Sequence, residues 1–213
     1  METPFTIEQF FEVFERYNTS VYPAQIIFLC LGIIALLLIT SRRKNSNYFI
    51  TGFLGFLWLW IGIVYHLNFF TSINKAAYGF GILFILQGLF FMREIFRTHL
   101  NFDSEKNGRT FLGYFFILFG LIFYPIIGYL LGAKISVTIS LGLPCPTTIL
   151  TFGFLMLAKK GFPKYLLIIP SIWAVIGTFA AVNFGVYQDF LMLIAAVIAN
   201  FYLLKKEKVP AVA

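Results

Sequence analysis

Residues 21–40 read VYPAQIIFLCLGIIALLLIT, and the basic stretch Ser41-Arg42-Arg43-Lys44 follows them directly. The run contains no charged side chain. About 20 predominantly apolar residues are what an α-helix needs to cross the hydrocarbon core of a bilayer. A long apolar run that stops at a basic loop therefore predicts a transmembrane helix whose C-terminal end lies beside the cytoplasmic surface.

The same pattern recurs along the rest of the chain. Six further apolar runs occupy residues 48–69, 77–92, 111–131, 137–158, 165–182 and 190–204. We therefore predict an all-α polytopic membrane protein with seven transmembrane helices. The expected organisation is an outer interfacial amphipathic helix at residues 1–20, a transmembrane domain at residues 21–204 and a cytoplasmic tail at residues 205–213.

The composition agrees with this class and excludes others. Of 213 residues, 60% are hydrophobic and 12% are charged, whereas soluble domains have about 45–50% apolar and about 25% charged residues. A soluble enzyme, a disordered chain and a nucleic-acid-binding domain are excluded, so the net charge of +7 does not indicate a nucleic-acid partner. The expected partner is the lipid bilayer.

The basic residues predict the orientation of the helices. Thirteen lie on one side of a seven-helix topology, at Arg42, Arg43, Lys44, Arg93, Arg97, Lys106, Arg109, Lys159, Lys160, Lys164, Lys205, Lys206 and Lys208. Only Arg16, Lys75 and Lys134 lie on the other side. Because cytoplasmic loops carry the excess of lysine and arginine, we expect the N-terminus outside and the C-terminus in the cytoplasm.

The first residues predict a short helix rather than a cleavable signal, because they lack a basic leading segment. Thr6 and Gln9 have the spacing of a capping box. Apolar residues recur on one face at Ile7, Phe10, Phe11, Phe14 and Tyr17. Such a helix is expected to lie in the outer interface. Two roles stay open for it: an anchoring helix, or a lid over an outward-facing cavity.

A shift of 115 residues places the first three predicted helices on the last three. Trp58 then matches Trp173, and Asn68 matches Asn183. We interpret the match as a possible parallel repeat in a three-plus-one-plus-three arrangement, a construction that some transporters use with the site at the repeat interface.

The stretch Leu143-Pro144-Cys145-Pro146-Thr147-Thr148 lies inside a predicted span. Two prolines in a helix interior remove two backbone donors, and the freed carbonyls need protein donors, water or a ligand. We therefore predict a broken helix here. Three interpretations stay open: a kink that the threonine hydroxyls cap, a site for a polar solute or ion, and a soft-metal site at the cysteine.

Other polar side chains cluster in the outer halves of the predicted spans. A purely structural role stays open for each of them: an interfacial histidine, a helix cap or a hydrogen bond between helices. The candidate substrate-binding residues are Cys145, Thr147, Thr148, His66, Asn68, Asn183, Asp189 and Gln87. If these side chains converge, they line a pocket that is open to the outside.

Several chemistries lack their motifs in the sequence. The last predicted span holds no lysine for a retinal Schiff base, and the chain has no glycine-rich phosphate loop and no His-Glu-x-x-His metalloprotease motif. We expect no cofactor, with the metal at Cys145 left open, and we expect a non-enzyme rather than an enzyme.

Motifs along almost the whole chain resemble those of a known family of membrane proteins. They are Phe5-Thr6-x-Glu8-Gln9-Phe10-Phe11, Tyr22-Pro23-Ala24-Gln25, Trp58-Leu59-Trp60-x-Gly62-x-x-Tyr65-His66, Gly142-Leu143-Pro144-Cys145-Pro146-Thr147-Thr148 and Gly185-Val186-x-Gln188-Asp189. The chain resembles an uncharacterised bacterial family of multi-pass membrane proteins, a domain-of-unknown-function family loosely labelled permease. The resemblance implies a bacterial inner-membrane protein, and it supplies no substrate and no catalytic residue.

The leading hypothesis is a small transporter, permease or channel-like protein for an unknown small solute or ion, with its outward-facing site near Cys145. Two alternatives stay open: a membrane accessory or sensor protein that moves nothing, and a membrane enzyme that binds a metal or cofactor. A polar pocket that reaches mid-membrane favours transport, and a dry packed bundle favours the accessory protein. The sequence leaves the oligomeric state open.

Overall fold

The computed structural model describes residues 4–41, 44–97, 100–103, 105, 107–159 and 161–205. Six of the basic residues used to predict the orientation lie outside the described residues: Arg42, Arg43, Lys106, Lys160, Lys206 and Lys208. The same is true of residues 1–3 and of all but Lys205 in the predicted tail. The described chain is helical, and it shows isolated bridges at Phe102 and Ala158 and at Leu141 and Leu143 in place of strands.

The all-α prediction is confirmed. The helices are α1 (Ile7–Val21), α2 (Ala24–Leu38), α3 (Lys44–Trp60), α4 (Ala77–Arg97), α5 (Gly108–Leu118), α6 (Tyr124–Leu130), α7 (Pro144–Leu157), α8 (Ile168–Phe184) and α9 (Phe190–Leu204). The π-helical segment Ile61–Phe69 continues α3, and the π-helical segment Phe119–Phe123 joins α5 to α6. Short 3₁₀ turns extend or precede several of the helices.

Six helical stretches of the described chain are long and apolar enough to cross a membrane. They are Ala24–Ser41, Asn45–Ser72, Ala77–Arg97, Gly108–Leu130, Lys164–Phe184 and Tyr187–Leu204. Large apolar side chains cover their outer surfaces, among them Leu37, Phe179 and Val197. Exposed apolar surface on this scale needs a cover other than water. The chain is a polytopic α-helical membrane protein.

The remaining predicted span, at residues 137–158, is shorter than the sequence pattern indicates. Its helix begins only at Pro144 and has 14 residues. Pro144 and Pro146 both lie in the first turn, where a backbone N–H has no partner within the helix, so proline is tolerated there. The prediction of a helix broken in its interior by these prolines was therefore wrong, because the prolines start the helix.

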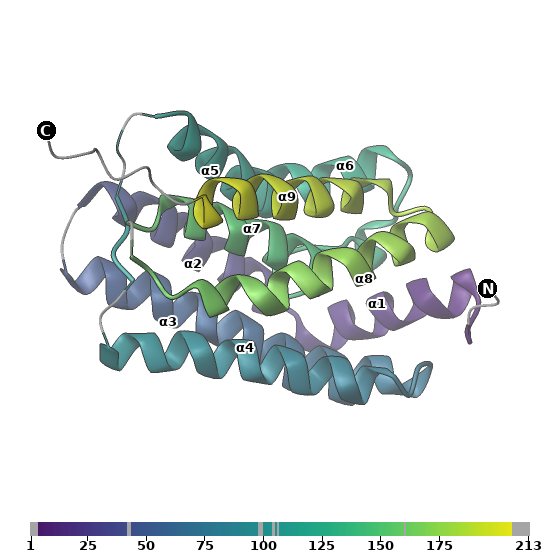
Figure 1. The fold of residues 1–213 in the computed structure, drawn as a ribbon. Coiled ribbons are helices and arrows are strands. Elements are labelled where there is room, and N and C mark those ends of the chain that lie inside the picture. The colour runs from purple at the N-terminus through teal and green to yellow at the C-terminus, as the bar shows by residue number, and fades with distance from the viewer. Residues whose placement is uncertain are drawn as a thin grey trace, which may run out of the picture.

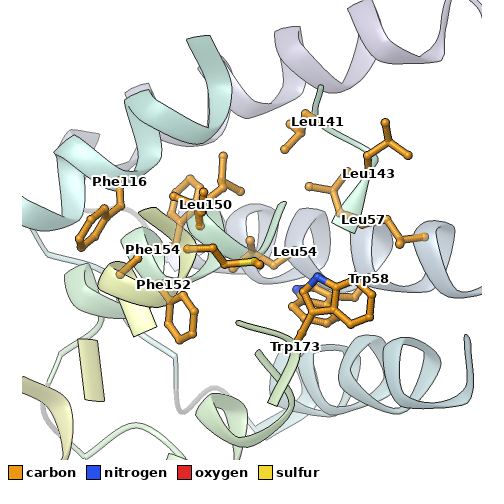
Figure 2. Close-up of a cluster of buried hydrophobic side chains, with 14 of the residues drawn as sticks. Leu54, Leu57, Trp58, Phe116, Leu141, Leu143, Leu150, Phe152, Phe154 and Trp173 are labelled. Carbon is orange, nitrogen blue, oxygen red and sulfur yellow. The ribbon is translucent and has the colours of Figure 1, made fainter. Parts of the chain in front are cut away.

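Helix α7 forms the centre of the bundle. It lies between α9 on one side and α3 on the other (Figure 1), and it also contacts α5 and α8. Figure 2 shows Leu150, Phe152 and Phe154 of α7 among hydrophobic side chains of α3 and α5. All three are fully buried. A helix surrounded by protein in this way has no lipid-facing side, and the seventh span at residues 137–158 stays a prediction.

The two ends of the bundle differ. Helix α1 occupies one end, here called the α1 end, and α4 and α9 finish at the opposite end (Figure 1). There the loop between α4 and α5 docks on the end of α7: the Asp103 N–H donates to the Leu157 carbonyl at 2.9 Å, and the Lys159 N–H donates to the Asn101 carbonyl at 2.7 Å. Phe102 of this loop is buried. This loop therefore closes the opposite end in part.

Candidate functional site

A cavity of about 220 Å³ lies at the α1 end, between α1, α8, the π-helical segment after α3 and the start of α7. We call it the α1 cavity. His66, Cys145, Asp189 and Asn183 are four of its lining residues. The structure thus brings together, from four different segments, half of the residues that the sequence singles out as candidates.

His66 enters the cavity from the π-helical segment Ile61–Phe69. Such turns are rare and occur often at functional sites. The imidazole is fully buried, and neither ring nitrogen has a hydrogen-bond partner among the described residues. Its neighbours are rings: Phe84 at 4.7 Å and Trp173 at 5.3 Å between centroids. A buried polar group without a partner costs free energy, so the position of His66 calls for an explanation beyond packing.

Asp189 stands at the N-cap position of α9, yet its side chain does not cap the helix. Its Oδ1 instead accepts a hydrogen bond from the Tyr124 hydroxyl. The Cys145 thiol is a neighbour of both groups and lines the cavity. Asp189 is almost completely buried, and the positive end of the α9 dipole favours negative charge at this place. The cavity wall therefore holds a carboxylate and a thiol, and the Tyr124 phenol supports the carboxylate from behind the lining residues.

Aromatic rings form most of the remaining wall. Phe5 and Phe10 of the N-terminal segment lie over the cavity, and both stack on Phe184 of α8, at 5.1 and 4.4 Å between ring centroids. Phe14 stacks on Tyr65 at 5.8 Å. The predicted capping box of α1 is confirmed, with the Gln9 N–H donating to the Thr6 hydroxyl oxygen. Both roles left open for this helix, anchor and lid, stay predictions, and three phenylalanines of the N-terminal segment line the cavity: Phe5, Phe10 and Phe14.

Hydrogen bonds fasten the C-terminal part of α1. The Tyr17 hydroxyl donates to the Gly142 carbonyl at 2.8 Å and accepts from Trp60 Nε1 at 2.8 Å. Asn18 Nδ2 donates to the carbonyls of Ser136 and Thr138. Burial raises the pKa of the Tyr17 phenol well above its usual range, against the lowering effect of the Trp60 hydrogen bond. The phenol stays protonated, so it keeps its donated bond.

Two threonines next to Cys145 do not line the cavity. The Thr148 hydroxyl donates to the Pro144 carbonyl at 2.8 Å, and the Thr147 hydroxyl accepts from the Gly142 N–H at 3.3 Å. Both side chains are fully buried. They satisfy the backbone around the proline-containing turn, which is the capping role that the sequence left open.

Three other candidates take structural positions. Gln87 Nε2 donates to the Leu166 carbonyl at 3.0 Å, which links α4 to the turn before α8, away from the cavity. Asn68 is exposed and donates to the Ile63 carbonyl of its own helical segment. Asn183 makes the same kind of bond, to the Phe179 carbonyl, but its residue also lies on the cavity wall.

Sequence reasoning missed two groups of the site. Tyr124 follows the π-helical segment Phe119–Phe123 in the middle of a span and bonds to Asp189. Its hydroxyl among apolar neighbours was the sequence feature that could have identified it. Trp173 was noticed only as a repeat partner, yet it lines the cavity with its Nε1 unpaired. The direction in which each side chain points depends on how α6 and α8 are rotated about their axes. A span that is apolar on every side has no polar stripe, so its sequence does not reveal that rotation.

The described residues contain no group of three or more histidine, cysteine, aspartate or glutamate side chains that could hold a metal ion. Within this part of the chain, Cys145 has one carboxylate and one phenol for neighbours, which falls short of the closed ligand set that structural metal sites use. The threonine capping matches the first interpretation of the Pro144-Cys145-Pro146 turn, and a polar-solute site at Cys145 stays a prediction.

Comparison with known proteins finds a family without an assigned role. The model of a family of unknown function, DUF6064, matches residues 7–213 of the chain. The match confirms the resemblance to a domain-of-unknown-function family that the motifs indicate. No curated protein and no solved structure matches the chain.

Proposed function

Since the chain belongs to DUF6064, a family of unknown function, we propose from its own geometry that it is a small transporter of the permease type. Its substrate site is the α1 cavity. The observation that carries the proposal is the convergence of His66, Cys145 and Asp189 on this one cavity. Ionisable groups within spans are costly, and a functional role is the usual reason for them.

The form of α7 supports a transport site. Residues 138–143 lead into the bundle as an irregular segment, and the helix starts at Pro144, directly at the cavity. Transporter sites are typically built where a helix is discontinuous, because non-helical backbone is tolerated there only against protein or a wet cavity. With the orientation that the basic residues predict, the α1 cavity faces outward, and the protein resides in the bacterial inner membrane.

The opposite end supplies the counterpart of an outward-facing state. Close contacts between glycines pack α7 against α5: a Cβ placed on Gly153 would lie 2.8 Å from the Gly113 carbonyl oxygen. The docked loop at Phe102 and Asp103 covers the end of α7. Release of a solute to the inside therefore requires these helices to move apart, as alternating access demands.

The test is the accessibility of Cys145. We expect a small membrane-impermeant methanethiosulfonate, added outside intact cells, to label the Cys30→Ser variant, in which Cys145 is the remaining thiol. The Cys145→Ser variant is the matched control. It retains Cys30, which is exposed on the surface of the apolar helix α2. We expect this surface to face lipid, which a charged reagent does not enter, so Cys30 should stay unlabelled. Equal labelling of the two variants, or no labelling of Cys145, would remove the support for an outward-facing site.

A sensor or accessory protein is the second candidate, and the packed opposite end favours it. Such a protein would bind a solute in the same cavity without moving it. Purified protein in proteoliposomes separates the two. A solute that protects Cys145 accumulates inside the vesicles if the protein transports it, and it stays outside if the protein only senses it.

A further inference from the structure

The charge inside the α1 cavity is unbalanced. Asp189 lines it, and no lysine or arginine is among the described residues that do so. The Tyr124 hydroxyl donates a hydrogen bond to the carboxylate, but it carries no positive charge. Buried charges in proteins are normally paired. The N-terminus of α9 supplies partial positive charge beside Asp189, but the described lining of the cavity supplies no positively charged side chain.

The rest of the wall suits a cation of a particular kind. Faces of aromatic rings attract cations, and recognition of ammonium groups by rings is a common use of this attraction. Phe10, Tyr65, Phe70, Phe80 and Trp173 all line the cavity. An inorganic cation such as Na⁺ or Ca²⁺ prefers a shell of several oxygen ligands, which this mainly aromatic wall does not offer. The surroundings fit an organic cation better than a metal ion.

The unpaired imidazole of His66 distinguishes between two kinds of organic cation, a protonated amine and a quaternary ammonium ion. A neutral imidazole has one nitrogen that accepts a hydrogen bond, and neither nitrogen of His66 has a partner in the part of the chain that the structure describes. A protonated amine has several N–H groups, so it can donate to Asp189 and to His66 together. A quaternary ammonium ion has none and would leave the imidazole unpaired.

We propose that the α1 cavity takes a small protonated amine, whose ammonium group is held by the Asp189 carboxylate and the unpaired His66 imidazole, and whose apolar part lies against the phenylalanine rings. The cavity volume of about 220 Å³ lies below the roughly 300–1,000 Å³ of sites for drug-sized ligands, so the amine is small. This inference rests on the proposed function, because it requires the α1 cavity to admit solutes.

The experiment compares two solutes that differ in their head group. n-Butylammonium and 1-butanol share one alkyl chain, and each is added to the Cys30→Ser protein in zwitterionic vesicles at constant ionic strength. The measured quantity is the concentration that halves the labelling rate of Cys145. We expect n-butylammonium to protect at a concentration about tenfold or more below that of 1-butanol, since hydrogen bonds to a buried charge are the strong ones.

The variant Asp189→Asn keeps the shape of the side chain and removes its charge, so we expect the preference for the amine to disappear. Asn68→Ala is the companion variant: Asn68 is exposed and does not line the cavity, so we expect the preference to persist. If Asp189→Asn does not fold, the comparison of the two solutes in the Cys30→Ser protein still decides the question.

The outcomes separate the inference from the proposed function. If 1-butanol protects as well as n-butylammonium, or if neither protects while Cys145 still reacts, the amine inference is overturned and the accessible cavity remains. If Cys145 does not react at all, the proposed function and the amine inference both fall. Protection by the amine that Asp189→Asn leaves unchanged would also overturn the inference.

Discussion

Tyr17 joins three parts of the molecule through one hydroxyl group. Its side chain leaves α1, donates to the carbonyl of Gly142 just before α7, and accepts from Trp60 at the end of α3. The side chain is fully buried. A buried group that loses its partner keeps the full cost of its lost hydration, so this hydroxyl has a larger effect on stability than an exposed one.

Replacing Tyr17 by phenylalanine should destabilise the protein and loosen α1. The change leaves the Gly142 carbonyl and the Trp60 N–H unpaired, at a cost of about 1–3 kcal/mol in the free energy of unfolding. We expect a lower midpoint of thermal unfolding in detergent and faster labelling of Cys145. Tyr22→Phe is the control, since Tyr22 is 70% exposed; surface changes of this kind shift stability by about 0.5 kcal/mol or less. Unchanged labelling in Tyr17→Phe would contradict a lid held by this residue.

Helix α7 shows how an element can be too short for a membrane and still belong inside one. Its 14 residues span roughly 21 Å at 1.5 Å per residue, less than the hydrocarbon core of about 30 Å. Protein surrounds it, and nearly every residue from Thr147 to Leu157 is buried. The glycines of α5 and α7 make this possible, because without side chains the two backbones approach closely.

Gly153→Ala should therefore disrupt the centre of the bundle. The added Cβ would lie 2.7 Å from Ile117 Cγ1 and 2.8 Å from the Gly113 carbonyl oxygen, and overpacking of this kind costs about 1–3 kcal/mol. Gly79→Ala is the matched control, because a Cβ there meets nothing within 4 Å and alanine favours a helix by about 0.5–1 kcal/mol. The midpoint of thermal unfolding should fall for Gly153→Ala and should stay the same or rise for Gly79→Ala. Equal behaviour of the two would show that the α5–α7 contact is not tight.

At the scale of the whole molecule, the distribution of charge predicts how the bundle sits in the membrane. Reporter fusions at residues 44, 106, 160 and 213 should report the cytoplasm, and fusions at residues 75 and 134 should report the outside, because the basic residues concentrate on one side. Activity of a cytoplasmic reporter and of a periplasmic reporter at each position provides the measurement. A single clear inversion among the six positions would contradict the predicted topology.

The parallel repeat stays a prediction at this scale. Trp58 and Trp173 both pack on Phe84, with ring centroids at 4.4 and 4.9 Å. The indole of Trp58 donates to the Thr151 hydroxyl, whereas that of Trp173 has no hydrogen-bond partner among the described residues. If the repeat is real, one rotation about an axis near the membrane normal superposes α2–α4 on the segment from α7 to α9.

The sequence by itself determined the class of the protein, the limits of most of its helices and the capped start of α1. These are local properties: the length of an apolar run decides whether a helix can span a bilayer, and a capping box involves residues three apart. Both were visible without any knowledge of which helices are neighbours. The prediction of where α7 starts was wrong. The sequence does not show whether a proline lies in a helix interior or in the first turn, and only the path of residues 138–143 distinguishes the two.

Only the tertiary structure decided which polar side chains share a cavity. His66, Cys145 and Asp189 are separated by more than forty residues from one another, and their meeting depends on how three segments are rotated and packed. Thr147, Thr148 and Gln87 carry similar polar groups but turn toward backbone carbonyls or N–H groups, because each buried polar atom bonds to the nearest partner that its helix rotation allows. In a chain whose helices are apolar on every side, the sequence does not encode those rotations as a visible stripe, so the site became apparent only from the packed bundle.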